Sequence, residues 1–118
     1  MKSIFLIFLI ILTLNSIYAQ SFPDQCVGTW KGTMHLFNRG SLKDSVKVIL
    51  TVAKTGQPAE WVWKTEYLSE KLPMTKDYTL RLKDADKNIY VTDEKNGIEL
   101  TDYLFNNKLY SIFCLLYT

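Results

Sequence analysis

The chain has 118 residues, with 14 Lys and Arg against 12 Asp and Glu, one His and two Cys. This length indicates one small domain. The near-neutral charge argues against nucleic acid or a strongly anionic surface as the partner, because both are bound by a marked excess of basic residues.

Residues 1–19 have the features of a signal peptide. Lys2 supplies a positive charge, residues 4–12 are apolar without interruption, and Ala19 is a small residue suited to cleavage. The apolar run is shorter than the roughly 20 residues that a membrane-spanning helix needs. We therefore expect an exported protein, secreted or periplasmic, that starts at or near Gln20 and has no membrane anchor after cleavage.

The mature chain, residues 20–118, is predicted to be a single all-β domain without helices. Strands are expected at 27–37, 46–53, 61–68, 78–82, 88–92, 98–105 and 109–116, with a loop at 69–75 that contains Pro73. The connections are mostly of hairpin length, and Asn96-Gly97 and Asn106-Asn107 are typical of tight turns. This spacing predicts an antiparallel up-and-down meander.

Such a meander fits a sandwich or a barrel, and it closes most simply as a barrel. Closure usually takes about eight or more strands. Seven strands therefore leave two alternatives, an incomplete barrel or a shortened member of a barrel family at its C-terminal end. We favour the second.

One turn has some likeness to a metal site. Asp84, Asp86 and Asn88 have the spacing that begins an EF-hand calcium loop. However, Ile89 occupies the position that needs glycine, and Lys95 the position that needs glutamate. We interpret the segment as a hairpin turn and expect no metal site.

The first expected strand begins with Gly28 and Trp30, in the segment Cys26-Val27-Gly28-Thr29-Trp30. This Gly-x-Trp resembles the opening of lipocalin-like (calycin) β-barrels. Glycine permits a tight bend there, and the indole is expected to be buried at one end of the barrel. Alternation then places Met34 on the inner face and His35 on the outer face, where a lone histidine is interpreted as surface. The resemblance implies non-enzymatic binding of a small hydrophobic molecule outside the cytoplasm.

Aromatic side chains recur along the strands and supply the candidate ligand-binding site. In a small barrel, inward aromatics either fill the core or line a small pocket. The second reading predicts a ligand site made of Trp30, Met34, Trp61, Trp63, Tyr67 and Tyr78. The alternative is an envelope protein-interaction module, an inhibitor or adaptor, that uses exposed strand edges. No nucleophile motif, zinc spacing or phosphate loop occurs, so we expect neither catalytic residues nor a cofactor.

The position of Asp102 is left open by the sequence. In a strand it shares a face with Ile98, Leu100 and Leu104. If that face is interior, Asp102 is a buried carboxylate that needs a partner. If Tyr103 faces inward instead, Asp102 lies on the surface.

Of the two cysteines, Cys26 lies at the beginning of the first expected strand and Cys114 lies well inside the seventh. In a meander this separates their Cα atoms by roughly 15–20 Å. A disulfide needs about 7 Å or less, so we predict that they do not pair within a monomer.

Overall fold

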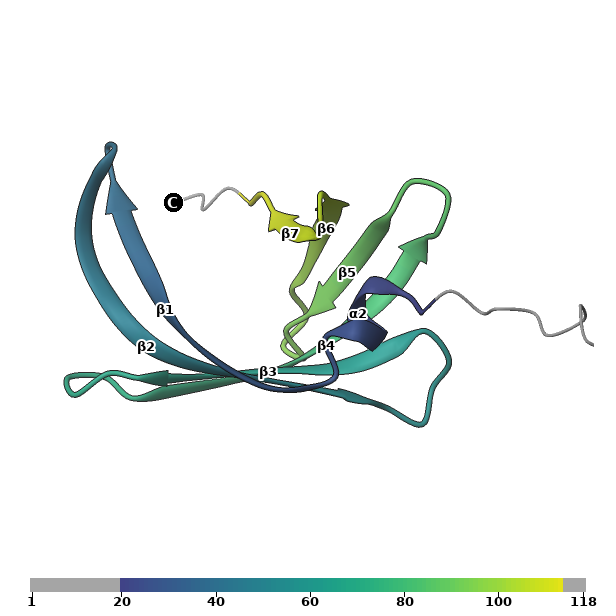
Figure 1. Cartoon of the computed structure of the whole chain (residues 1–118), viewed down its shortest axis with the longest axis horizontal. Coiled ribbons are helices and arrows are strands. Elements are labelled where there is room, and N and C mark those ends of the chain that lie inside the picture. The colour runs from purple at the N-terminus through teal and green to yellow at the C-terminus, as the bar shows by residue number, and fades with distance from the viewer. Residues whose placement is uncertain (1–19, 114–118) are drawn as a thin grey trace, which may run out of the picture.

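The computed structural model describes residues 20–113 and confirms the all-β meander (Figure 1). The signal-peptide prediction and Cys114 lie outside these residues. A short helix precedes seven strands, with bounds α2 Phe22–Gln25, β1 Gly28–Asn38, β2 Ser41–Lys54, β3 Glu60–Leu68, β4 Met74–Asp84, β5 Ile89–Asp93, β6 Glu99–Phe105 and β7 Lys108–Ser111. Among the described residues, no helix is long and apolar enough to cross a membrane.

The strands form one sheet whose spatial order, β1 to β7, is their order in the chain, and every neighbouring pair is antiparallel. The sheet curls into a half-barrel (Figure 1). Within residues 20–113, β1 pairs only with β2 and β7 only with β6. The incomplete barrel, the alternative that we did not favour, is therefore what the described residues form.

Two of the hairpins turn in only two residues. Arg39 and Gly40 join β1 to β2 with φ of 49° and 76°, and Asn106 and Asn107 join β6 to β7 with φ of 49° and 57°. Positive φ at both positions is the mark of a type I′ turn, whose twist matches that of the flanking strands. The expected turn at 106–107 is confirmed, and so is the turn at residues 85–88.

Two elements differ from expectation in an informative way. β4 begins at Met74, four residues earlier than expected, because Pro73 immediately precedes the strand, where its missing N–H removes no ladder hydrogen bond. The helix α2 was not expected. Its signals are a proline at the start and Asp24 in its first turn, and both are weak in a helix of four residues.

The register defines one face of the sheet, which we call the concave face. Cross-strand partners point to the same side, and partner pairs connect Trp30 to Leu50, Val52 to Trp63, and Trp61 to Leu80. Because the indole of Trp61 donates a hydrogen bond to Asp24 of α2, and α2 lies inside the curl (Figure 1), this shared face is the inner one.

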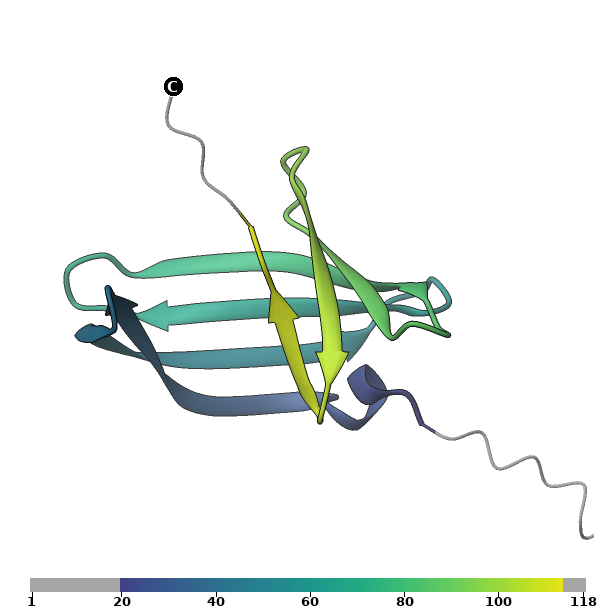
Figure 2. The ribbon, with the colours of Figure 1, turned by 90° about the horizontal axis from the view of Figure 1, so that it is seen from above.

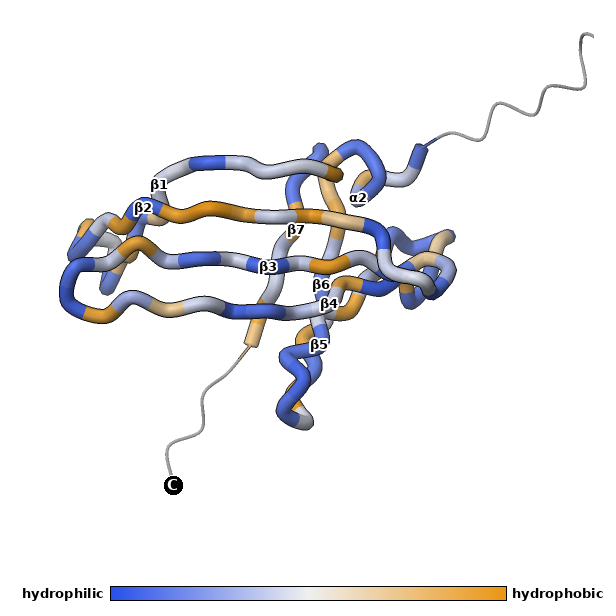
Figure 3. The backbone as a smooth tube through the Cα atoms, turned by 90° about the horizontal axis from the view of Figure 1, so that it is seen from below, coloured by the Kyte–Doolittle hydropathy of each residue, from blue (hydrophilic) through white to orange (hydrophobic). Residues whose placement is uncertain are grey.

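The buried core lies on the concave face beside α2. It consists of Val52, Trp61, Leu80 and Tyr90, with Leu104 of β6 and Leu109 of β7 among the residues packed against it. β6 and β7, yellow-green and yellow in Figure 2, run across β1–β4 and so stand over this part of the sheet. Among the strands, β2 has the longest run of residues coloured as hydrophobic (Figure 3). The other end of the concave face, near the β1–β2 turn, is not covered by β6 or β7 (Figure 2).

The register also settles the position of Asp102, which is fully buried. Its carboxylate accepts a hydrogen bond from Thr92 Oγ1 at 2.5 Å and another from Ser111 Oγ. A buried carboxylate needs such donors to offset lost hydration. Asp102 therefore links β6 to both of its neighbours, β5 and β7.

Candidate ligand-binding groove on the concave face

The structure places all six predicted site residues on the concave face but does not gather them into one pocket. Trp61 is part of the core and is only 4% exposed. Trp63 and Tyr78 are cross-strand partners in the middle of the concave face. Met34 and Tyr67 line a groove further from α2. Trp30 stands apart near the start of β1.

Trp30 corrects the expectation of a buried plug, because it is 53% exposed. Its indole Nε1 donates a hydrogen bond to the carbonyl of Cys26 at 2.6 Å. Gly28 has φ of +136°, which agrees with the tight bend expected there. Alternation was right about the face, but among the described residues no strand lies beyond β1 to cover the ring.

The groove that contains Met34 and Tyr67 is an open cavity with a mainly apolar lining. It has a volume of about 440 Å³ and lies between the tip of the β1–β2 hairpin and the β3–β4 connection. Its apolar lining comes from Met34, Leu36, Val46, Tyr67, Leu72 and Met74, and its polar lining from Asp44, Ser69 and Lys71. Several of these apolar side chains are exposed, Leu72 by 70%.

A lysine adjoins the groove on the same face. Lys76 follows Met74 by two residues in β4, so it points to the concave side, and it is the cross-strand partner of Thr65. It is half-buried, and its Nζ lies 5.9 Å from the centroid of the Tyr78 ring. This contact is a cation–π interaction. Lys76 forms no ion pair with a carboxylate of residues 20–113.

Tyr67 lines the groove and is the cross-strand partner of Met74, which lies two residues before this lysine. Burial raises the pKa of its phenol, the nearby Tyr78 raises it further, and the positive charge of Lys76 opposes both effects. The net direction is upward. Tyr67 is therefore a neutral hydroxyl at physiological pH, able to donate a hydrogen bond into the groove.

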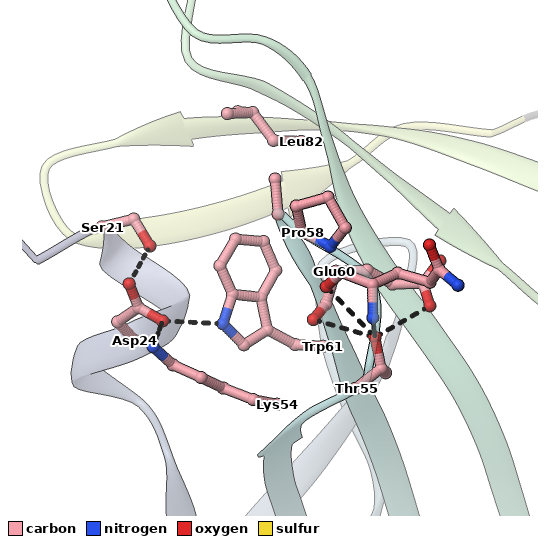
Figure 4. A pocket seen from close by; sticks show the side chains of 10 residues that line it. Ser21, Asp24, Lys54, Thr55, Pro58, Glu60, Trp61 and Leu82 are labelled. Atoms are coloured by element: carbon pink, nitrogen blue, oxygen red, sulfur yellow. Dashed lines mark hydrogen bonds and ion pairs between the residues drawn. The ribbon is translucent and has the colours of Figure 1, made fainter.

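A second cavity, of about 350 Å³, lies against α2 (Figure 4). Asp24 accepts hydrogen bonds from Trp61 Nε1 at 2.9 Å and Ser21 Oγ at 3.0 Å, and its Oδ1 lies 3.1 Å from Lys54 Nζ. The hydrogen bond from Trp61 is the main cause that lowers the pKa of Asp24. Because these polar groups satisfy one another, we interpret the cluster as the attachment of α2 to the sheet rather than a ligand site.

Two further observations concern the outer face. His35 is exposed, as predicted, and its Nδ1 lies 2.8 Å from Ser45 Oγ. Tyr103 and Tyr110 are cross-strand partners on that face, both about half exposed.

Sequence reasoning missed Lys76, Leu72 and Met74. Alternation counted back from Tyr78 would have placed Lys76 and Met74 on the inner face. That signal was hidden because Pro73 led us to interpret residues 69–75 as a loop.

Comparison of the chain with protein-family models, curated proteins and solved structures finds no match. The lipocalin-like resemblance therefore stays a prediction, and function is argued from the concave face alone.

Proposed function

We propose that this is an exported, non-enzymatic binding protein that holds a small hydrophobic ligand on its concave face. The observation that carries the proposal is the groove between the β1–β2 tip and the β3–β4 connection. Its volume of about 440 Å³ is within the range of small-molecule sites, roughly 300–1,000 Å³. An apolar lining with a few polar groups at its rim is also typical of such sites.

The exposure of this apolar surface supports the proposal. Leu36, Leu72 and Met74 are all at least 40% exposed, although they share a single cavity. Clustered apolar side chains in contact with water carry a free-energy cost that a bound apolar molecule removes. Trp63 and Tyr78 extend the same surface toward the core.

A titration with Nile red, a neutral dye whose fluorescence rises in apolar surroundings, tests the proposal. The chain should bind the dye saturably, and Leu72→Asp should weaken binding because it puts a charge in the groove. Phe105→Asp is the matched control, since Phe105 is 66% exposed on the outer face. Equal loss in both variants, or no saturable binding, would contradict the proposal.

A second candidate function is a protein-interaction module. The observation that favours it is the edge of β1, which is eleven residues long and has a partner on one side only within the described chain. An extended segment of another protein can add to such an edge. Native mass spectrometry of protein purified from its own host distinguishes the candidates, since a co-purifying small molecule supports the first and a bound protein the second.

A further inference from the structure

We infer that the ligand is a single-chain amphiphile whose anionic head group binds Lys76 while its apolar chain occupies the groove. This inference rests on the proposed function and names the chemical class of its ligand. It starts from the charged groups of the concave face.

Lys76 differs from the other charged groups near the core. Lys54 forms an ion pair with Asp24, and the carboxylate of Asp102 is hydrogen-bonded on both oxygens. Lys76 has the face of Tyr78 beside it but no carboxylate partner in residues 20–113. It is therefore a half-buried cation whose strongest possible partner, an anion, is not provided by the described chain.

The surroundings strengthen an interaction at this point. Met74 and Tyr78 flank Lys76 on the same face of β4, and the interaction of two charges grows as the local dielectric constant falls. The neutral hydroxyl of Tyr67 is available as a second donor to an anionic oxygen. A carboxylate at this position would exchange water for a charge-assisted hydrogen bond.

The groove also indicates the direction of the ligand. Lys76 adjoins the groove beside Met74 and Tyr67, whereas Asp44 lines the part near the β1–β2 tip. The charge of Asp44 repels an anion there and also offsets the attraction of Lys71, which shares the rim. The head group therefore lies at Lys76, and the chain extends toward Met34 and Leu72.

The experiment measures displacement of Nile red by decanoate and by 1-decanol, both kept at monomeric concentrations at pH 7.5. These competitors share an apolar chain and differ in head-group charge. Decanoate should bind about tenfold more tightly than decanol, the factor expected for a hydrogen bond to a charged group. High salt should reduce this preference.

Four variants locate the charge that matters. Lys76→Met should remove the preference for decanoate and leave decanol binding nearly unchanged, whereas Lys76→Arg should keep the preference. Lys64→Met is the matched control, because Lys64 lies on the neighbouring strand with its side chain on the outer face. Lys71→Met tests the rim lysine and should leave the preference in place. Far-UV circular dichroism confirms that each variant folds.

The outcomes separate this inference from the proposed function. Saturable Nile red binding without a preference for decanoate, or a preference that survives Lys76→Met or is lost with Lys71→Met, would overturn the inference and leave the proposed function standing. Absence of Nile red binding would overturn both. Attachment to vesicles of anionic lipid without binding of monomeric decanoate would replace the inference with recognition of a membrane surface.

Discussion

Replacement of each of two tryptophans by alanine gives the clearest test of where the core lies. Trp61 is 4% exposed, packs with its ring centroid 6.4 Å from that of Tyr90, and donates a hydrogen bond to Asp24. Trp61→Ala should therefore lower the free energy of unfolding by about 3–5 kcal/mol, as other large-to-small changes of buried aromatics do. Trp30, at 53% exposure, has lost only about half as much surface to the interior.

Trp30→Ala should cost about half as much, roughly 1.5–2.5 kcal/mol on the same scale. Urea denaturation followed by far-UV circular dichroism measures both values, because this signal does not depend on the indole that is removed. A cost for Trp30→Ala equal to or above that for Trp61→Ala would refute the reasoning. It would mean that Trp30 is covered in solution and that it anchors the fold, as the sequence suggested.

Four further predictions concern Asp24, the two cysteines and the amino terminus. The pKa of Asp24 is lowered in the folded state, so its contribution to stability is present above the unfolded pKa near 3.8 and is lost as the pH falls through the folded value. The urea midpoint should therefore decrease as the pH drops below about 4, and this decrease should be less steep in Asp24→Asn. At pH 7, Asp24→Asn should be less stable than the parent protein by about 1–2 kcal/mol. Burial raises the pKa of Cys26, so the Cys26 thiol should react slowly with thiol reagents at neutral pH in the folded protein. The denatured, unreduced monomer should titrate with two free thiols, and a cross-linked peptide of Cys26 and Cys114 would contradict this. Amino-terminal sequencing of protein from its host should begin at or near Gln20, whereas an intact Met1 would count against export.

Local patterns carried much of the fold. Alternation correctly placed Met34 on the same face as Trp30, and the Asn106-Asn107 pair located a tight turn, because both signals depend on neighbours in the chain. The exposure of Trp30 could not be read in this way, since it depends on whether another strand covers β1.

Longer-range contacts were the part that the sequence could not supply. The partners of Asp102, Thr92 and Ser111, come from two other strands, so they appear only once the register of both pairs is known. The bond between Trp61 and Asp24 joins residues 37 positions apart with no pattern linking them. The inward position of Lys76 could have been predicted from alternation, but only if the strand had been extended back to the residue after Pro73.

The sequential order of the sheet has a consequence for how the chain folds. Each strand pairs with its neighbour in sequence, so each hairpin closes only a short loop. The conformational entropy that the chain loses before the contacts of a hairpin form is therefore small. Strand pairing can thus spread along the sheet one hairpin at a time. Docking of α2 is different. Asp24 precedes the β1–β2 hairpin and Trp61 follows it, so the hydrogen bond between them closes a long loop that contains the whole hairpin. We expect α2 to attach after β2 and β3 have paired, which makes it a late step that locks a sheet already formed.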